Sequence, residues 1–182
     1  MADQRSALKS QSDARRFASP EGAKDISTEE EIMAGAFTNL LYHIVFSTKN
    51  RERIILDSFR ERLYEYAGGI IRSKGGRLLS IGGTQDHIHM AVKLKATEAV
   101  SKTIGELKGN SSKWINENKF LDKYFSWQAG YAAFSASESQ IGALVAYIET
   151  QQEHHRVKSF KEELIAILEK HRISYDHVLI WK

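Results

Sequence analysis

The sequence predicts an α+β domain with the element order β-α-β-β-α-β, followed by two further helices. Apolar residues alternate between strand-like and helix-like spacing along residues 37–182. Turn-forming or charged clusters separate the segments. The only proline is Pro20, so no proline interrupts these elements. This order is that of the ferredoxin-like fold, a split βαβ sheet with helices on one face.

The first strand is predicted at residues 40–48, with apolar side chains on both faces, and the charged turn 49–53 follows it. A helix comes next and ends at Gly75 and Gly76. The apolar positions with helical spacing are Phe59, Leu63, Tyr66, Ala67, Ile70 and Ile71.

Two strands are then predicted at residues 77–83 and 87–94, joined by a turn at 84–86. A second amphipathic helix follows them. Its apolar positions are Val100, Ile104, Leu107, Trp114 and Ile115.

The last predicted strand is the aromatic-rich segment 125–134. Ser137 and Gln140 form a capping-box pattern that opens a third helix. A fourth helix is predicted at 160–171, and residues 174–181 close the chain. The apolar positions of the third helix are Ile141, Leu144, Val145 and Ile148.

Composition divides the chain in two. Residues 1–36 carry five basic and seven acidic residues and little apolar surface, so we expect a flexible N-terminal extension. Residues 37–182 carry a net charge of +5, which is compatible with nucleic acid as a partner. Without cysteine, any metal must bind N and O ligands. No signal peptide or membrane-spanning segment is evident, so we expect a cytoplasmic protein without a membrane partner.

His87 and His89 are separated by one residue within a predicted strand. Residues i and i+2 of a strand point to the same face, so both imidazoles can reach one metal ion. Asp86 is placed to support a ligand through an outer-shell contact, or simply to cap the turn. The alternative to a metal site is that both histidines are ordinary strand residues, exposed to solvent or hydrogen-bonded in the core.

Tyr147 and Gln151 are four residues apart in a helical segment and share one face. A phenol is almost fully protonated at neutral pH, so a nucleophilic tyrosine needs a nearby cation or base. A metal held by His87, His89 and Gln151 would polarise a phosphate next to Tyr147. Taken alone, Tyr147 is more simply a tyrosine at the edge of the core.

Two more histidines follow on the same helix. His154 lies on nearly the same face as Tyr147, where it would donate a proton or contact a phosphate. His155 is better explained by its favourable charge at the end of a helix, and His154 is open to that explanation too.

At these residues the chain resembles the single-tyrosine HUH transposases, small enzymes that move insertion sequences as single-stranded DNA. It is most similar to members associated with repetitive extragenic palindromes. The similar stretches, in family order, are residues 41–49, 86–90, 107–115 and 147–155.

The resemblance implies the ferredoxin-like fold and a divalent ion, Mg or Mn, bound by His87, His89 and Gln151. It implies that Tyr147 attacks a DNA phosphate and leaves a 5′-phosphotyrosine and a free 3′-hydroxyl. Family members are homodimers that recognise DNA hairpins, often with the tyrosine helix of one subunit completing the His site of the other. The extension 1–36 has no counterpart in the resemblance.

Basic residues lie at two places where DNA phosphates could bind. Lys49, Arg51 and Arg53 follow the first strand, and Lys108 and Lys113 lie on the second helix. A solvated charged surface is the alternative. The sequence also offers aromatic residues for base stacking, which are Trp114, Tyr124, Trp127 and Tyr131.

Three other functions remain open. A replication-initiator or relaxase-like nicking enzyme would use the same residues on an origin. A domesticated, non-catalytic hairpin-binding protein would need no metal. An unrelated metal protein could use the His pair on small substrates and leave Tyr147 inert.

Overall fold

The computed structural model describes residues 37–177 and residue 180, and the predicted flexible extension 1–36 lies outside the described residues. Four strands form one antiparallel sheet in the order β2-β3-β1-β4. Strands β1 and β2 lie on either side of β3, which is the split βαβ arrangement, so the predicted fold class is confirmed. The strands are β1 Leu40–Ser47, β2 Arg77–Gly83, β3 His87–Leu94 and β4 Ala132–Ala136.

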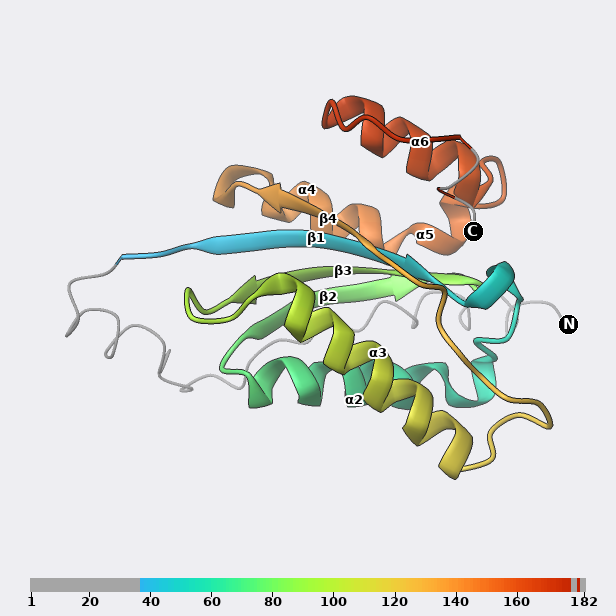
Figure 1. The fold of residues 1–182 in the computed structure, drawn as a ribbon. Coiled ribbons are helices and arrows are strands. Elements are labelled where there is room, and N and C mark those ends of the chain that lie inside the picture. Colours follow the sequence, from blue (N-terminus) through green and yellow to red (C-terminus); the bar gives the residue numbers. More distant parts are fainter. Residues whose placement is uncertain (1–36, 178–179, 181–182) are drawn as a thin grey trace, which may run out of the picture.

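Helices cover both faces of the sheet (Figure 1). The two helices of the βαβ units cover one face, as predicted, and the C-terminal helices lie over the other. On the first face are α2 Asp57–Ser73 and α3 Val100–Glu117; on the second are α4 Glu138–Glu149, α5 Gln151–His154 and α6 Phe160–Lys170. A single 3-10 turn, η1 Lys49–Arg51, follows β1. None of the helices among the described residues is long and apolar enough to cross a membrane.

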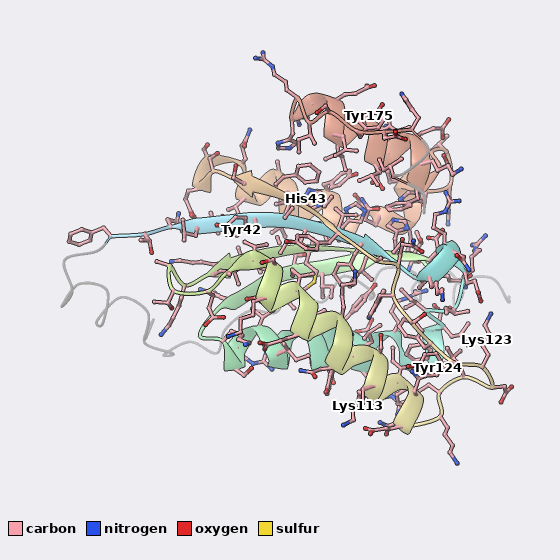
Figure 2. All side chains as sticks on the ribbon, viewed as in Figure 1. Tyr42, His43, Lys113, Lys123, Tyr124 and Tyr175 are labelled. Atoms are coloured by element: carbon pink, nitrogen blue, oxygen red, sulfur yellow. The ribbon has the colours of Figure 1, made fainter. Side chains whose placement is uncertain are left out.

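Alternation along β1 sorts its side chains between these two layers. Ile44 and Phe46 belong to the large core with α2 and α3, whereas Val45 packs in a smaller cluster with Phe134 and residues of α6. Tyr42 and His43 likewise lie on opposite faces of the strand (Figure 2). The face of β1 that carries His43 is therefore the one covered by the C-terminal helices.

The strand predicted at residues 125–134 begins later, at Ala132. Two aromatic residues before it, Phe125 and Trp127, are hydrogen-bonded to α3. The Phe125 backbone exchanges two hydrogen bonds with the Asn116 side chain, at 2.8 and 2.9 Å, and the Trp127 indole donates to Ser111 Oγ at 2.9 Å. These side-chain bonds take the place of strand pairing, apart from one bridge between Thr48 and Trp127.

The capping box predicted at Ser137 is also wrong, because its side-chain hydrogen bonds do not form. The helix does start after Ser137, but the Ser137 hydroxyl contacts the Ser139 hydroxyl at 3.0 Å and caps no backbone N–H. A reciprocal capping box occurs instead at α6. There, Ser159 Oγ accepts from the Glu162 N–H at 3.3 Å, and the Glu162 carboxylate accepts from the Ser159 N–H at 2.9 Å.

Candidate active site

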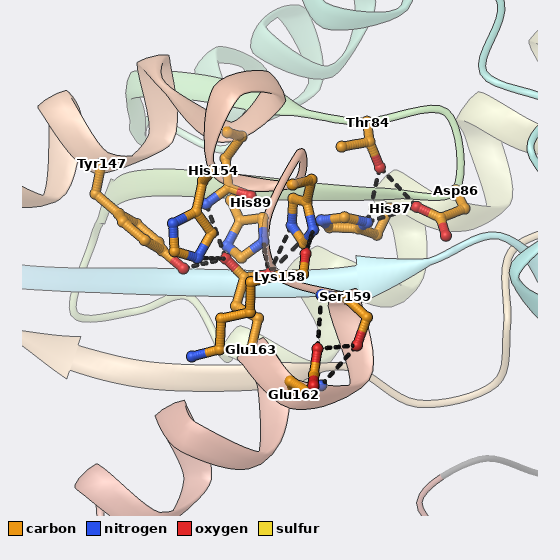
Figure 3. A network of polar contacts seen from close by, with 12 residues as sticks. Thr84, Asp86, His87, His89, Tyr147, His154, Lys158, Ser159, Glu162 and Glu163 are labelled. Carbon is orange, nitrogen blue, oxygen red and sulfur yellow. Dashed lines mark hydrogen bonds and ion pairs between the residues drawn. The ribbon is translucent and has the colours of Figure 1, made fainter.

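His87 and His89 lie on β3 and point to the face covered by α4, α5 and α6 (Figure 3). Both side chains are fully buried. His87 Nδ1 lies 2.6 Å from Asp86 Oδ1, and Thr84 Oγ1 donates to the same carboxylate oxygen at 2.6 Å. Because a carboxylate only accepts, His87 Nδ1 donates to Asp86, and this bond turns Nε2 of the ring toward the interior. Asp86 therefore fixes the orientation of the His87 ring.

Opposing effects act on the Asp86 carboxyl group. Burial raises its pKa, but hydrogen bonds from His87 and Thr84 outweigh burial and hold the pKa below its ordinary value. Asp86 is thus anionic at neutral pH and remains an acceptor for His87.

His89 is supported by His43 of β1, a residue whose role the sequence analysis missed. His43 Nε2 and His89 Nδ1 lie 2.9 Å apart, and the rings stack. Burial lowers the pKa of His43 from 6.5 to about 3 and the pKa of His89 to about 4. Both rings are therefore neutral at neutral pH, as metal-binding imidazoles must be.

Tyr147 lies on α4, with its ring edge against His43 and His89 at centroid distances of 6.1 and 5.8 Å. Its hydroxyl donates a hydrogen bond to Glu163 of α6. Burial, followed by the Glu163 carboxylate, raises the pKa of Tyr147. The tyrosine is therefore a neutral phenol in this arrangement.

Gln151 is the first residue of α5 and is 1 % exposed. Its amide Nε2 donates to Glu163 Oε1 at 3.0 Å. The chain bends at Thr150 between α4 and α5, yet Tyr147 and Gln151 still face the same site, as their spacing predicted. Tyr147 of α4 thus lies against the His89 ring of its own chain, and Gln151 of α5 is joined to the same cluster through Glu163.

Three side-chain atoms at this site are buried without any hydrogen-bond partner. They are Nε2 of His87, Nε2 of His89 and Oε1 of Gln151. Among the described residues only five such atoms occur, and the other two, on Arg60 and Tyr64, belong to α2. A buried polar atom without a partner is costly, and lone pairs on N and O are the donors a divalent ion needs. The residues present therefore fit a metal ion.

Glu163 is the main feature that sequence reasoning missed. It lies on α6, is 1 % exposed, and contacts side chains from β3, α4 and α5. Burial works against its ionisation, but the hydrogen bond from His155 and the close His89 imidazole prevail and lower its pKa. A usable signal existed: Glu163 interrupts the apolar face of a helix, three residues after Phe160 and five before Leu168.

His154 and His155 both approach Glu163. His155 Nε2 lies 3.0 Å from Glu163 Oε2, and its Nδ1 donates to the Lys158 carbonyl at 2.7 Å. His155 is thus part of the cluster and does more than favour the end of a helix. His154 lies beside the Tyr147 ring at 5.4 Å and lines a cavity of about 420 Å³ that reaches Tyr147 and Glu163.

The basic residues chosen from sequence lie outside this cluster. Lys49 and Arg51 belong to η1, directly after the end of β1 that pairs with His87. Arg53 donates to Gln85 in the turn before His87, at 3.2 Å. This basic turn therefore borders the edge of the sheet where the site lies.

The two lysines on α3 lie across the sheet from the site. The Lys108 ammonium is half-buried and donates to the carbonyls of Gln128, at 2.6 Å, and Gly130. It therefore holds the 128–130 loop against α3. Lys113 is exposed and lies 3.7 Å from Glu117. Of the aromatic candidates for base stacking, Trp127 is buried in the core, whereas Tyr124 is 79 % exposed.

Comparisons with known proteins find transposases. The transposase for insertion sequence element IS200 from Salmonella typhimurium is 27% identical over 135 residues, which cover 71% of this chain and 88% of that protein. The corresponding transposase from Salmonella typhi matches to the same extent.

Two solved structures share the fold. A putative transposase from Deinococcus radiodurans R1 has a TM-score of 0.53 and 22% identity, covering 64% of this chain and 94% of that one. A REP-associated tyrosine transposase bound to a REP hairpin also has a TM-score of 0.53, with 16% identity, covering 65% of this chain and 70% of that one.

The chain also matches the model of a protein family over most of its length. Residues 36–151, well over half of the chain, match the family model described as "Transposase IS200 like". That segment contains the sheet, the His pair, Tyr147 and Gln151, and it ends before α6. The chain belongs to the IS200-like transposase family.

Proposed function

We propose that this transposase cleaves and rejoins single-stranded DNA through a 5′-phosphotyrosine, with Tyr147 as the nucleophile and a divalent ion held by His87, His89 and Gln151. One observation supports this most directly. The three candidate ligand atoms are buried without partners, and the Tyr147 hydroxyl reaches the same cluster through Glu163. The N and O donor set suits Mg or Mn, and the chain has no thiolate to offer.

When bound, the ion would supply positive charge to the scissile phosphate and to the departing oxygen. The protein supplies the nucleophile and its position. The Tyr147 oxygen forms a bond to phosphorus while the bond from phosphorus to the 3′ oxygen breaks. The phenol proton passes along the hydrogen bond to the Glu163 carboxylate and on to solvent, and the 3′ oxygen takes a proton from solvent, so that no net proton is gained or lost. Rejoining is the reverse, with a 3′-hydroxyl attacking the phosphotyrosine.

The cavity beside Tyr147 suits a DNA strand at the point of cleavage. Its lining includes His154, Lys158 and Lys170, which are candidates for contact with phosphate oxygens. The His154 ring lies beside the ring of the proposed nucleophile, at 5.4 Å, and His154 is the residue that we assign to the scissile phosphate.

We further propose that the DNA partner carries hairpins. A structural relative is bound to a REP hairpin, and this chain places a basic turn, Lys49, Arg51 and Arg53, at the edge of the active site. Lys113 adds an exposed charge on α3, and Lys108 could add a phosphate contact beyond its two carbonyls. The homodimer and the cytoplasmic location remain predictions.

The competing functions differ in ways that can be tested. The family match favours a transposase over a replication-initiator or relaxase-like nicking enzyme, and multiple gene copies flanked by palindromes would add to that. A non-catalytic hairpin-binding protein would have no need for unpartnered His and Gln atoms beside a tyrosine.

A covalent-adduct assay tests the proposal. The protein is incubated with single-stranded oligonucleotides from both flanks of its gene and with Mg²⁺ or Mn²⁺, and adducts are separated on a denaturing gel. We expect an adduct with the wild type only when metal is present, and none with Tyr147→Phe. Tyr175→Phe is a matched control, because its hydroxyl also donates to a glutamate of α6, Glu169, and it should react normally.

Equal adduct formation by Tyr147→Phe would rule out the assigned nucleophile. Hairpin binding without any adduct would instead favour the non-catalytic binding protein.

A further inference from the structure

We infer that α6 supplies a fourth protein ligand to the metal site, the carboxylate of Glu163, so that the site is completed from outside the segment shared with the family. This inference rests on the proposed metal site of His87, His89 and Gln151. The matched segment ends at residue 151, whereas Glu163 lies in the middle of α6.

Glu163 is a buried carboxylate on an otherwise apolar helix face. Its neighbours on the inner face of α6 are apolar, and Phe160 and Leu168 pack against Val45 and Phe134 of the sheet. A carboxylate in such a position is expensive unless a positive charge or several hydrogen bonds compensate for its lost hydration. A helix that needed only to cover the sheet would carry an apolar residue here.

The two oxygens of Glu163 face different partners. Oε2 lies 3.2 Å from His89 Nε2 and 3.7 Å from His87 Nε2. Donor atoms that share one ion at about 2.1 Å lie about 3.0–3.4 Å apart, so the 3.2 Å separation suits neighbouring ligands and the 3.7 Å separation is a few tenths of an ångström longer. The His87 ring turns Nε2 toward this side, because Nδ1 is bonded to Asp86. At 3.7 Å, Nε2 and Oε2 are too far apart for a hydrogen bond, and a cation shared by the two atoms would give Nε2 the partner that it lacks.

The other oxygen, Oε1, accepts hydrogen bonds from Tyr147 and from Gln151 Nε2. An amide whose nitrogen is fixed in this way has its oxygen set as well, and Gln151 Oε1 is the atom left without a partner. Glu163 thus orients one proposed ligand and holds the nucleophile while its second oxygen faces the histidines. His155 supports the carboxylate from the side, with its Nε2 3.0 Å from Oε2.

Three of the four proposed ligands lie in one compact group. The candidate atoms of His87, His89 and Glu163, together with His155, all lie within 4.8 Å of one another. Two imidazoles, one amide oxygen and one carboxylate make an N₂O₂ set that suits a hard divalent ion such as Mn²⁺.

Manganese binding to the full-length chain tests the inference without relying on catalysis. Mn²⁺ is titrated into metal-free protein, and binding is followed by loss of the free-ion EPR signal and by calorimetry. The variants are Glu163→Gln, Glu163→Asp and His87→Ala. Glu162→Gln is the matched control, because it removes a charge from the next residue while glutamine still completes the capping box of α6.

We expect His87→Ala and Glu163→Gln each to weaken Mn²⁺ binding by about ten- to a hundredfold, and Glu162→Gln to change it little. Glu163→Asp should also weaken Mn²⁺ binding, since its carboxylate is withdrawn by one methylene group. This variant replaces Glu163→Gln in the test if the glutamine variant does not fold.

The outcomes separate the two proposals. If His87→Ala loses the ion while folded Glu163 variants keep wild-type affinity, Glu163 is not a ligand and the His site stands. Tighter binding by Glu163→Gln would mean that the carboxylate competes with the ion, which also overturns the inference. If wild type and His87→Ala show the same negligible binding, the metal site itself fails and both proposals fall.

Discussion

The backbone of Gly82 on β2 lies directly against the main chain of Ile148 on α4. A Cβ at position 82 would fall 2.3 Å from the Ile148 carbonyl oxygen and 3.1 Å from its Cγ2. Only glycine allows this approach, and Ile148 is itself fully buried. The contact sets the height of α4 above the sheet, and therefore the distance from Tyr147 to the histidines.

Gly82→Ala should displace α4 from the sheet. We expect a loss of about 1–3 kcal/mol in the free energy of unfolding, because a methyl group has no room at this contact. We also expect a larger loss of adduct formation than of DNA binding, since Tyr147 and Gln151 move away from the His pair together. Chemical denaturation and the adduct assay measure the two effects.

Gly142→Ala is the control for that variant. Gly142 lies on the same helix with nothing within 4 Å of an added Cβ, so alanine should stabilise the protein by up to about 1 kcal/mol. Similar behaviour of the two alanine variants would contradict a role for Gly82 in seating α4.

Asp86→Ala should weaken ion binding without removing a ligand. The variant leaves His87 Nδ1 without its carboxylate at 2.6 Å, so the ring loses its fixed orientation. We expect affinity for Mn²⁺ to fall by about ten- to a hundredfold, with adduct formation restored at saturating ion. Asp122→Ala, at an exposed position, should bind normally. A defect that persists at saturating ion would show that Asp86 does more than orient His87.

Acid should destabilise the metal-free protein. His43 and His89 are buried and neutral, with pKa values lowered to about 3 and about 4. Between pH 6.5 and these values the unfolded chain binds protons at both positions and the folded chain does not, so stability falls as pH falls. The loss approaches about 2 kcal/mol per histidine at pH 5. His155, whose pKa is raised beside Glu163, opposes this in part.

The measurement is thermal unfolding in the presence of a chelator from about pH 7 to about pH 5. His43→Phe, which removes one of the two lowered pKa values, should reduce the pH dependence. Constant or rising stability on acidification would contradict the assignment of neutral rings.

Local sequence pattern was enough for most of the fold. The strands 77–83 and 87–94 begin and end where predicted, because alternation and a short turn define a hairpin within one short segment of the chain. The segment 125–134 was misassigned for a non-local reason. Its aromatic residues have strand propensity, but Asn116 and Ser111 of α3 fix them outside the sheet.

The candidate site was predictable where one element carries the geometry. The His pair on a strand and the Tyr147–Gln151 spacing in a helical segment are local patterns, and the structure brings them together. Glu163 and His43 were missed because their importance depends on which elements pack together. No spacing rule links a glutamate on the last helix to histidines more than seventy residues earlier.

Basic residues of the turn after β1 should contribute to DNA affinity through phosphates. Lys49→Ala combined with Arg53→Ala should weaken hairpin binding and lower the slope of log K against log salt by about one per lost contact. Arg77→Ala is the control, because Arg77 is exposed at the opposite end of the sheet, where its partner Lys93 lies. Equal effects of the two changes would indicate only a general loss of positive charge. Fluorescence anisotropy at several salt concentrations measures both.

The packing of α4 and α5 on the His pair of their own chain predicts an active site assembled within one subunit. A mixture of Tyr147→Phe and His87→Ala proteins distinguishes the two possible arrangements. If Tyr147 works with the histidines of its own chain, each variant lacks an essential group at its only site, and the mixture forms no adduct. If the helix is exchanged in a homodimer, a mixed dimer contains one intact site, with Tyr147 from one subunit and His87 from the other, and adduct formation returns. The first result is expected from the contacts of Tyr147 and Gln151 with Glu163 of the same chain, and the second would show that these contacts are replaced on dimerisation.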